Sequence, residues 1–279
     1  PDKNVRIGEI TLADKNKPVY CVPDPAQPKL RVEKGDGKEL TEGKDYTVKY
    51  TNNKKPGDHA KYKVTFIGNY KGRKAETGEF IITPAPFDKA VISAASIVYT
   101  GSGKLQPELY VFSDGVLLAN KKDYTFRLYY GDDDVTSKKN PLEEKDLPAK
   151  ITVEATGRGR FKGDKATGSF MVYALPGGAF DLTSAKIVDK KTGKPLKKQD
   201  YTGKEIRPSV TVLAKTKDSS EYRTVPSENL IISYYDNVQR GTAKIEVRGD
   251  NVKAFGCRKA GFTIGVRGIK NILPHIFEN

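Results

Sequence analysis

One strand pattern occurs three times in this chain, and it limits what the chain can fold into. Apolar and polar residues alternate over residues 61–66, 149–155 and 243–248. Such alternation is typical of a strand with one buried face and one solvated face. Each run is followed by a glycine-containing link and a second apolar stretch. The phenylalanines in these stretches, Phe80 and its two equivalents, are 90 and 92 residues apart along the sequence. The sequence therefore predicts an all-β chain built from three copies of one unit.

The parts upstream of each run also repeat. Residues 45–50, 123–128 and 229–234 match one another, and each match predicts a further strand. Asn and Gly at residues 52–57, and Asp, Asn and Gly at residues 236–241, predict hairpin connections, because these residues tolerate positive φ angles. A proline comes early in one predicted strand of every copy, and these prolines are Pro28, Pro107 and Pro208.

Short Pro- and Gly-containing segments separate the copies. We expect three β-sandwich domains, at residues 1–84, 85–175 and 176–279, arranged as an extended rod. The second domain carries an insertion at residues 131–148, and the third ends in a C-terminal tail that begins near residue 265.

The residue inventory argues against catalysis. The chain has only two histidines, His59 and His275, and only two cysteines, Cys21 and Cys257. His59 stands in a turn-like stretch and His275 lies close to the end, so neither position suits a nucleophilic site. Four closely spaced Cys or His ligands for zinc are lacking, as is a Gly-rich nucleotide loop. We expect no catalytic residues and no cofactor. Two free, largely buried thiols are the simpler interpretation of the cysteines, and a Cys21–Cys257 disulfide requires the first and third copies to fold back on each other.

The string at residues 201–208 (Tyr-Thr-Gly-Lys-Glu-Ile-Arg-Pro), followed by 234–243 and Gly249, resembles the tandem immunoglobulin-like repeats of Gram-positive (Firmicutes) cell-surface proteins. The resemblance extends three times over nearly the whole chain. The first copy departs from it with Cys21-Val22 where Thr-Gly is expected, and the second replaces the Asn-Asn hairpin by its insertion. The resemblance implies an immunoglobulin-like fold, an extracellular, cell-surface or cell-wall location, and a spacer or adhesive role without catalytic residues.

The charge of the chain indicates which kind of ligand it attracts. Lys and Arg number 49 against 35 Asp and Glu, a net charge of +14, and residues 179–279 are the most basic part. We expect attraction to an anionic wall polymer, a glycan or a host protein, with the site on the insertion or on the third copy. Lysine outnumbers arginine, which argues against a shaped nucleic-acid site. The apolar runs are too short to span a membrane, and we expect a monomer.

The insertion contains the weak metal-site candidates Asp132, Asp133 and Asp134, because clustered carboxylates can hold Ca²⁺. A solvated acidic loop beside lysines is the simpler interpretation. Intramolecular isopeptide crosslinks occur in some Gram-positive surface domains, but the sequence singles out no residues for one. The sequence thus predicts a non-enzymatic stalk or adhesin segment. The alternatives are a recognition module for a host protein or glycan, and accessory domains of a secreted enzyme whose catalytic domain lies elsewhere.

Overall fold

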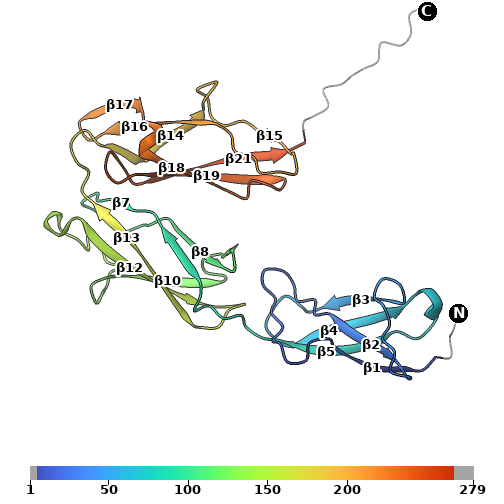
Figure 1. Ribbon diagram of the computed structural model, residues 1–279. Coiled ribbons are helices and arrows are strands. Elements are labelled where there is room, and N and C mark those ends of the chain that lie inside the picture. Colours follow the sequence, from blue (N-terminus) through green and yellow to red (C-terminus); the bar gives the residue numbers. More distant parts are fainter. Residues whose placement is uncertain (1–4, 267–279) are drawn as a thin grey trace, which may run out of the picture. The chain divides into compact units, whose positions relative to one another are not determined.

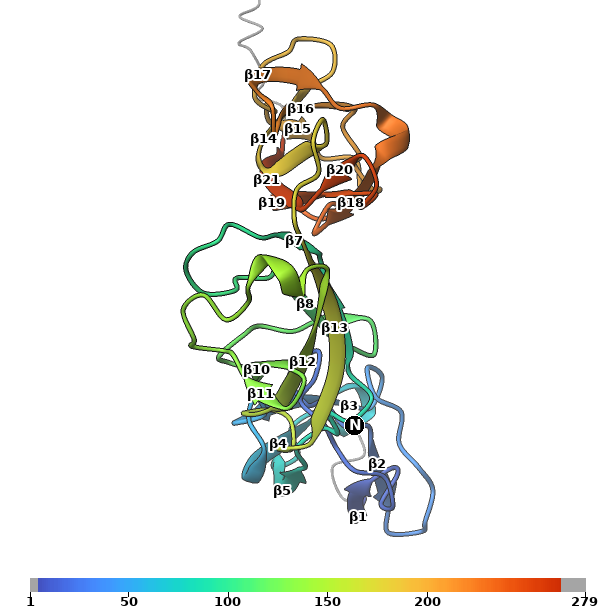
Figure 2. The same cartoon turned by 90° about the vertical axis from the view of Figure 1, so that its left-hand side faces the viewer.

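The computed structural model describes residues 5–266, apart from the side chain of Asp58. In this range the chain consists of strands and connecting loops (Figures 1 and 2). The helical elements of the described chain are three short 3-10 turns: η1 Gly68–Tyr70, η2 Glu144–Asp146 and η3 Ser227–Asn229. The predicted all-β fold is confirmed. None of the helical elements between residues 5 and 266 is long and apolar enough to cross a bilayer.

The first copy contains two sheets. One pairs two strands in the order β1-β2 and the other three strands in the order β3-β4-β5. Their bounds are β1 Ile7–Leu12, β2 Leu30–Lys34, β3 Tyr46–Thr51, β4 Gly57–Phe66 and β5 Glu76–Ile82. β4 is antiparallel to both of its neighbours.

The second copy also contains two sheets, with the orders β6-β8-β9 and β11-β10-β12-β13-β7. The bounds are β6 Val91–Ala94, β7 Ile97–Val98, β8 Leu109–Ser113, β9 Val116–Leu117, β10 Tyr124–Tyr130, β11 Asp133–Asp134, β12 Ala149–Gly157 and β13 Lys165–Tyr173. The predicted insertion thus supplies β11, which pairs with the end of β10.

The third copy has sheets in the orders β17-β16-β14-β20 and β15-β21-β19-β18. The bounds are β14 Phe180–Asp189, β15 Gln199–Asp200, β16 Val210–Thr216, β17 Ser219–Thr224, β18 Leu230–Tyr235, β19 Gly241–Gly249, β20 Ala254–Phe255 and β21 Cys257–Gly265. β15 runs parallel to β21, whereas β18 and β21 are antiparallel to β19.

The chain divides into two compact units. One comprises the residues up to Ile92 with 110–126 and 154–167, and the other comprises 93–109, 127–153 and the residues from Gly168 onward. The prediction of three domains, at 1–84, 85–175 and 176–279, stays a prediction.

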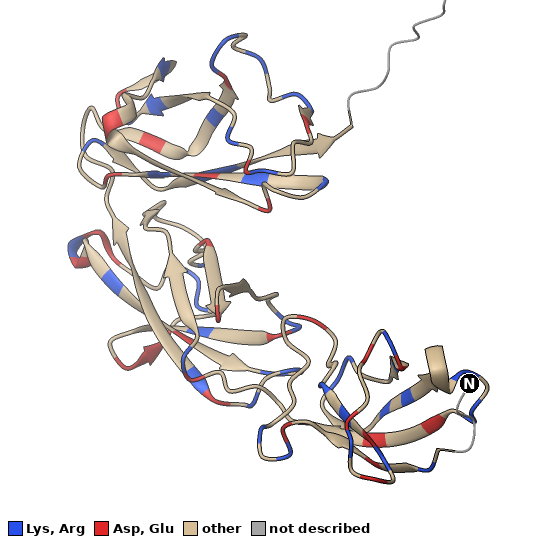
Figure 3. Ribbon diagram, turned by 45° about the vertical axis from the view of Figure 1, so that its right-hand side comes forward, with Lys and Arg blue, Asp and Glu red and all other residues tan. Residues whose placement is uncertain are grey.

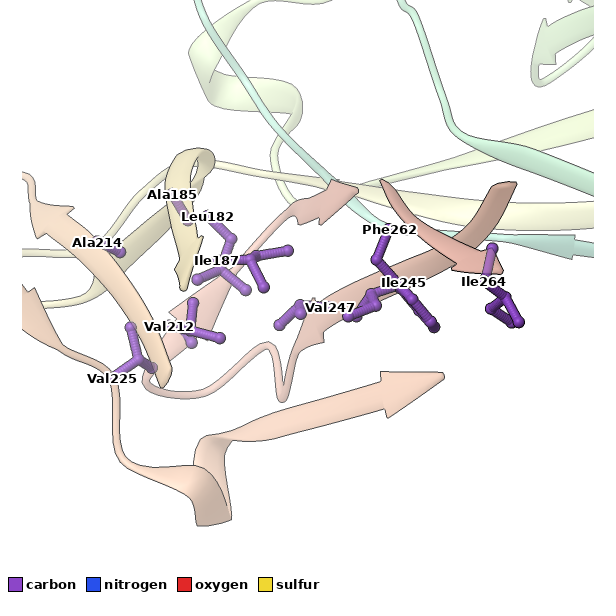
Figure 4. Packing of buried hydrophobic residues seen from close by; sticks show 12 residues of the cluster. Leu182, Ala185, Ile187, Val212, Ala214, Val225, Ile245, Val247, Phe262 and Ile264 are labelled. Carbon is purple, nitrogen blue, oxygen red and sulfur yellow. The ribbon is translucent and has the colours of Figure 1, made fainter. Parts of the chain in front are cut away.

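Apolar side chains from facing sheets fill the core of the third copy. Leu182 and Ile187 on β14 and Val212 on β16 pack in one cluster with Ile245 on β19 and Ile264 on β21. Figure 4 shows these side chains in one cluster between the ribbons of the two sheets. Burying a side chain of this size contributes about 1.5–3 kcal/mol relative to leaving it exposed. The first unit has equivalent clusters, one around Val32 and Val64 and another around Phe87 and Val111. This two-layer packing is that of a β-sandwich.

The predicted alternation is confirmed along β4, β12 and β19, with one exception. Val64, Ile151 and Ile245 are fully buried, as their faces required. Glu246 is also fully buried, although the pattern placed it on the solvated face of β19. Its Oε2 accepts hydrogen bonds from Tyr235 Oη and Arg248 Nη2, both at 3.1 Å. The Arg248 guanidinium also donates to Ser93 Oγ, so residues of the 93–109 segment contact this face of the sheet.

Two local predictions were wrong in detail. Pro28, Pro107 and Pro208 do mark the starts of strands, but each lies two residues before its strand, which begins at Leu30, Leu109 or Val210, and so none is inside one. The pattern called His59 a turn residue, but it lies within β4 and is exposed. His275 and most of the predicted C-terminal tail lie outside the described residues.

Candidate functional site: a basic hollow beside the first hairpin

The hairpin between β3 and β4 is held in place by an asparagine. Asn53 is buried; its Nδ2 donates to the carbonyl of Ala26 at 2.8 Å, and the Ala26 N–H donates back to the Asn53 carbonyl at 2.8 Å. The third copy repeats this device, because Asn237 and Ile206 exchange the same two hydrogen bonds. Asn52 and Gly57 have positive φ angles, as the sequence predicted for a hairpin. The residues that follow Asn53 are therefore presented on a fixed loop.

A hollow of about 630 Å³ lies beside this loop, within the first compact unit. Its basic lining residues come from three separate parts of the sequence: Lys54 and Lys55 from the hairpin, Lys122 from the turn before β10, and Arg160 from the loop between β12 and β13. The remaining lining residues are Cys21, Pro23, Pro25, Pro56 and Gly159. Among the described residues, the lining set contains four cations and no carboxylate.

Arg160 is oriented by a buried acid. Asp123 is 2% exposed, and its two carboxylate oxygens accept hydrogen bonds from Arg160 Nε and Nη2 at 3.0–3.1 Å. The same carboxylate accepts the Ala119 N–H at 3.0 Å, and Arg160 Nη1 also donates to the Pro23 carbonyl at 3.3 Å. This bidentate geometry fixes the guanidinium at the wall of the hollow.

The three lysines differ from Arg160. Lys54, Lys55 and Lys122 are exposed, and none of them belongs to an ion pair of the described chain. A second hollow, of about 620 Å³, lies against the same hairpin and shares Lys54, Lys55 and Pro56 with the first. The hairpin thus offers two lysine ammonium groups to anions in either hollow.

Cys21 does not make this hollow a nucleophilic site. The side chain is buried, and burial raises the pKa of its thiol, an effect that the nearby Arg160 charge opposes. At neutral pH the group is a thiol, which is a weak nucleophile compared with the thiolate. Both cysteines are free, and Cys257 is partly exposed. The chemistry that this site can perform is the binding of anions beside the apolar rings of three prolines.

The acidic candidates of the insertion are placed differently. Asp133 and Asp134 form β11; Asp134 pairs with Arg127 at 3.2 Å and accepts the Thr136 N–H at 3.0 Å, and Asp133 lies 3.7 Å from the Lys138 ammonium. Hydrogen bonds from Thr136, and then the Arg127 charge, hold the pKa of Asp134 below its usual value. In the part of the chain that the structure describes, neither Asp132–Asp134 nor any other residues form a cluster of three or more side chains able to ligate a metal ion.

The sequence predicted the hairpin but not the hollow. Adjacent lysines at a hairpin tip are a weak signal in a chain this rich in lysine. Lys122 and Arg160 are far from this hairpin in the sequence, and only the tertiary structure brings them to the hollow. Figure 3 shows Lys and Arg distributed over loops and strands throughout the described chain, so charge alone does not single out one surface.

Comparison with known proteins identifies no family. No family model and no curated protein matches the chain. Similar solved structures include the protocadherin gammaB7 EC3-6 cis-dimer, at 9% identity and a TM-score of 0.26, with 94% of this chain and 76% of that chain covered. Another is the N-terminal four Ig domains of Dscam1 isoform 6.44, at 12% identity and a TM-score of 0.18, with 83% and 63% covered. A third is a SusE-like surface-located polysaccharide-binding protein from the heparin utilisation locus of Bacteroides thetaiotaomicron, at 12% identity and a TM-score of 0.16, with 95% and 68% covered. Likenesses at these TM-scores and identities establish neither a family nor a function.

Proposed function

We propose that this chain is a non-catalytic segment of a bacterial cell-surface protein, and that its basic hollow binds an acidic polysaccharide. In this proposal three tandem immunoglobulin-like domains, at residues 1–84, 85–175 and 176–279, act as an extracellular spacer and adhesin of the Gram-positive type. The observation that carries the binding role is the convergence of Lys54, Lys55, Lys122 and Arg160 on one hollow.

The lining suits a charged sugar polymer better than a compact ion. Three exposed lysines are mobile point charges that can follow sulfate, carboxylate or phosphate groups spaced along a chain. The rings of Pro23, Pro25 and Pro56 offer apolar surface to the C–H faces of sugar rings. Arg160 is already paired with Asp123, so its part is to shape the wall and to add little net charge.

The third copy is more basic in composition, but many of its cations have local partners. Lys186 and Lys215 lie over the ring of Tyr222 at 4.0 and 5.2 Å, and Arg240 lies over Tyr201 at 4.8 Å. Further pairs in this copy are Arg207–Glu205, Arg223–Glu221, Lys244–Asp236 and Arg248–Glu246. The ion pairs neutralise part of the charge of this copy, and the ring contacts hold Lys186, Lys215 and Arg240 in place, which favours the hollow as the site.

The test compares two triple variants of the full chain with the same change in net charge. The first, K54Q/K55Q/K122Q, removes the unpaired lysines of the hollow. The matched control, K190Q/K194Q/K197Q, removes three exposed lysines of the third copy. Binding to immobilised heparin and to teichoic acid is measured at low salt, with neutral dextran as a negative surface.

We expect the hollow variant to bind at least about tenfold more weakly than the wild type, because each exposed charge contact contributes up to about 1 kcal/mol and three are lost together. The control variant loses no contact in the hollow, so its affinity should stay within about threefold of the wild type. Binding of the wild type to heparin and to teichoic acid should vanish in about 0.5 M salt, because salt screens the charges. Equal losses in the two variants would mean that net charge, and not the hollow, governs binding. Preference for heparin or for teichoic acid distinguishes a host glycan from a wall polymer.

Two alternative functions, a receptor for a host protein and an accessory segment of an enzyme, can be distinguished from this proposal by experiment. A host-protein receptor role predicts binding on a protein array that survives the hollow variant. An accessory role in an enzyme predicts a hydrolase domain in the reading frame of the parent protein, whereas a stalk predicts further copies or a wall-anchor signal.

A further inference from the structure

The edge of one sheet in the third copy is open. β18 lies at the end of the order β15-β21-β19-β18 and pairs with β19 along all six of its residues. In the described chain, no strand pairs with its other side. An antiparallel strand directs the N–H and C=O groups of every second residue away from its one neighbour, so the outer side of β18 presents backbone groups for pairing.

The other two copies show how this edge is protected elsewhere. β3, β10 and β18 are equivalent strands; in the first and third copies the equivalence is shown by Tyr50 and Tyr234, whose hydroxyls donate to the carbonyls of Pro28 and Pro208. In the second copy, β11 covers the edge of β10 near its end. In the first copy, β3 is also an edge, but it carries the exposed Lys49 on its outer face. Lysines and short covering strands are the usual means of preventing edge-to-edge pairing.

β18 has neither protection. Its sequence, Leu-Ile-Ile-Ser-Tyr-Tyr, contains no charged residue. Ser233 occupies the position held by Lys49 in the first copy and by Arg127 in the second. The outer row of β18 consists of Ile231, which is 59% exposed, Ser233 and Tyr235. β-branched and aromatic residues in such a row favour strand pairing.

We propose that β18 pairs with β18 of a second copy of this chain, antiparallel and about a two-fold axis, so that one sheet continues through both copies. In such a pair, the core-facing residues of one strand lie opposite the core-facing residues of the other only when the two-fold axis passes through a residue, here Ile232 or Ser233. Ile231 then faces Ser233 or Tyr235 of the second copy and loses its exposure to water.

An identical strand is the best partner for this edge. The edge has no charge pattern that would select a foreign strand. A second β18 supplies equal length, the same alternation of faces and no like-charge contact along the paired strands, which makes the contact self-complementary. This assembly differs from the monomer expected from the sequence.

The experiment measures the association of the full chain by sedimentation equilibrium from about 5 to 500 µM, the range in which a contact of modest size becomes visible. S233K installs the cation of the other two copies at a half-buried position opposite Glu246, and circular dichroism checks that this variant folds. T47K, at the position on β3 equivalent to Ile231, is the matched control. I231K is a second disrupting variant at a side chain that is already largely exposed.

We expect a concentration-dependent dimer in the wild type, at least tenfold weaker association in S233K and I231K, and unchanged association in T47K. Amide hydrogen exchange of residues 230–235 should slow with protein concentration in the wild type alone. A wild type that stays monomeric at the highest concentration would overturn the proposal. So would S233K and I231K variants that fold and dimerise like the wild type, or a T47K variant that weakens association equally.

Discussion

Replacing Asp123 by alanine should destabilise its surroundings far more than the same change at Asp45. The two residues occupy the same place in their copies, each just before a buried tyrosine, Tyr124 or Tyr46. Each accepts the N–H of the residue four positions earlier, Ala119 at 3.0 Å or Thr41 at 2.9 Å. They differ in that Asp123 is buried and paired with Arg160, whereas Asp45 is half-buried and forms no ion pair among the described residues.

The magnitude follows from this difference. D45A removes one solvent-exposed hydrogen bond and should cost about 0.5–1 kcal/mol of unfolding free energy. D123A removes the same bond and also leaves the Arg160 guanidinium, whose side chain is 21% exposed, with the Pro23 carbonyl as its remaining acceptor. Breaking a buried ion pair costs about 3–5 kcal/mol, and partial access to water places this case near 3 kcal/mol. With a urea m-value of about 1.5 kcal/mol/M, the midpoint should fall by about 2 M, against about 0.5 M for D45A.

The assay must report on each region separately, because a chain with more than one folded unit need not unfold in one step. Pulsed hydrogen exchange along a urea series, read by mass spectrometry, follows residues 119–126 for D123A and 41–48 for D45A. R160M and the double variant D123A/R160M complete a cycle, and the double variant should lose much less than the sum of the two single losses. Equal shifts for D123A and D45A, or strict additivity in the cycle, would refute the inference that the buried pair is the source of the difference.

Two further predictions rest on single contacts. Burial raises the pKa of the Cys257 thiol to about 11, with added contributions from Glu246 and Glu108, so we expect its alkylation by iodoacetamide to rise between pH 9 and pH 11, as the reactive thiolate forms. This pKa is higher in the folded chain than the ordinary value of 9.0, so the contribution of Cys257 to stability is complete below pH 9 and is lost as the pH approaches 11. An alkylation midpoint near pH 9 in the folded chain would contradict the raised pKa. G157A should lower the unfolding free energy of its region by about 1–3 kcal/mol, because a Cβ there would lie 2.2 Å from the Lys162 carbonyl oxygen. The control G163A, with nothing within 4 Å of its new Cβ, should be neutral or slightly stabilising in the same exchange assay, and similar losses in both variants would show that the close approach is unimportant.

The strands of this protein were predictable because their signal is local. Alternation at residues 61–66 and 149–155 fixes which side chains face the core, and Asn or Asp with positive φ fixes where the hairpins turn. Glu246 was placed wrongly because period-two alternation describes one sheet and not what covers its second face. The basic hollow was missed for a related reason, since no local pattern links Lys54 to Lys122.

The first and third copies separate scaffold from function by what they share. Asn53 and Asn237 tie the hairpins in the same way, and Tyr50 and Tyr234 make the same hydrogen bond, so these residues maintain the fold in both copies. Where two copies have the same backbone but different residues at a position, the side chain at that position is not required to maintain the fold. Directly after the tying asparagine, the first copy has Lys54-Lys55 where the third has Val238-Gln239. Exchanging these two dipeptides should therefore leave both hairpins folded and move polyanion binding from one copy to the other only in part, because Lys122 stays behind. Complete transfer of binding would show that the hairpin alone is sufficient and that the hollow is not the site.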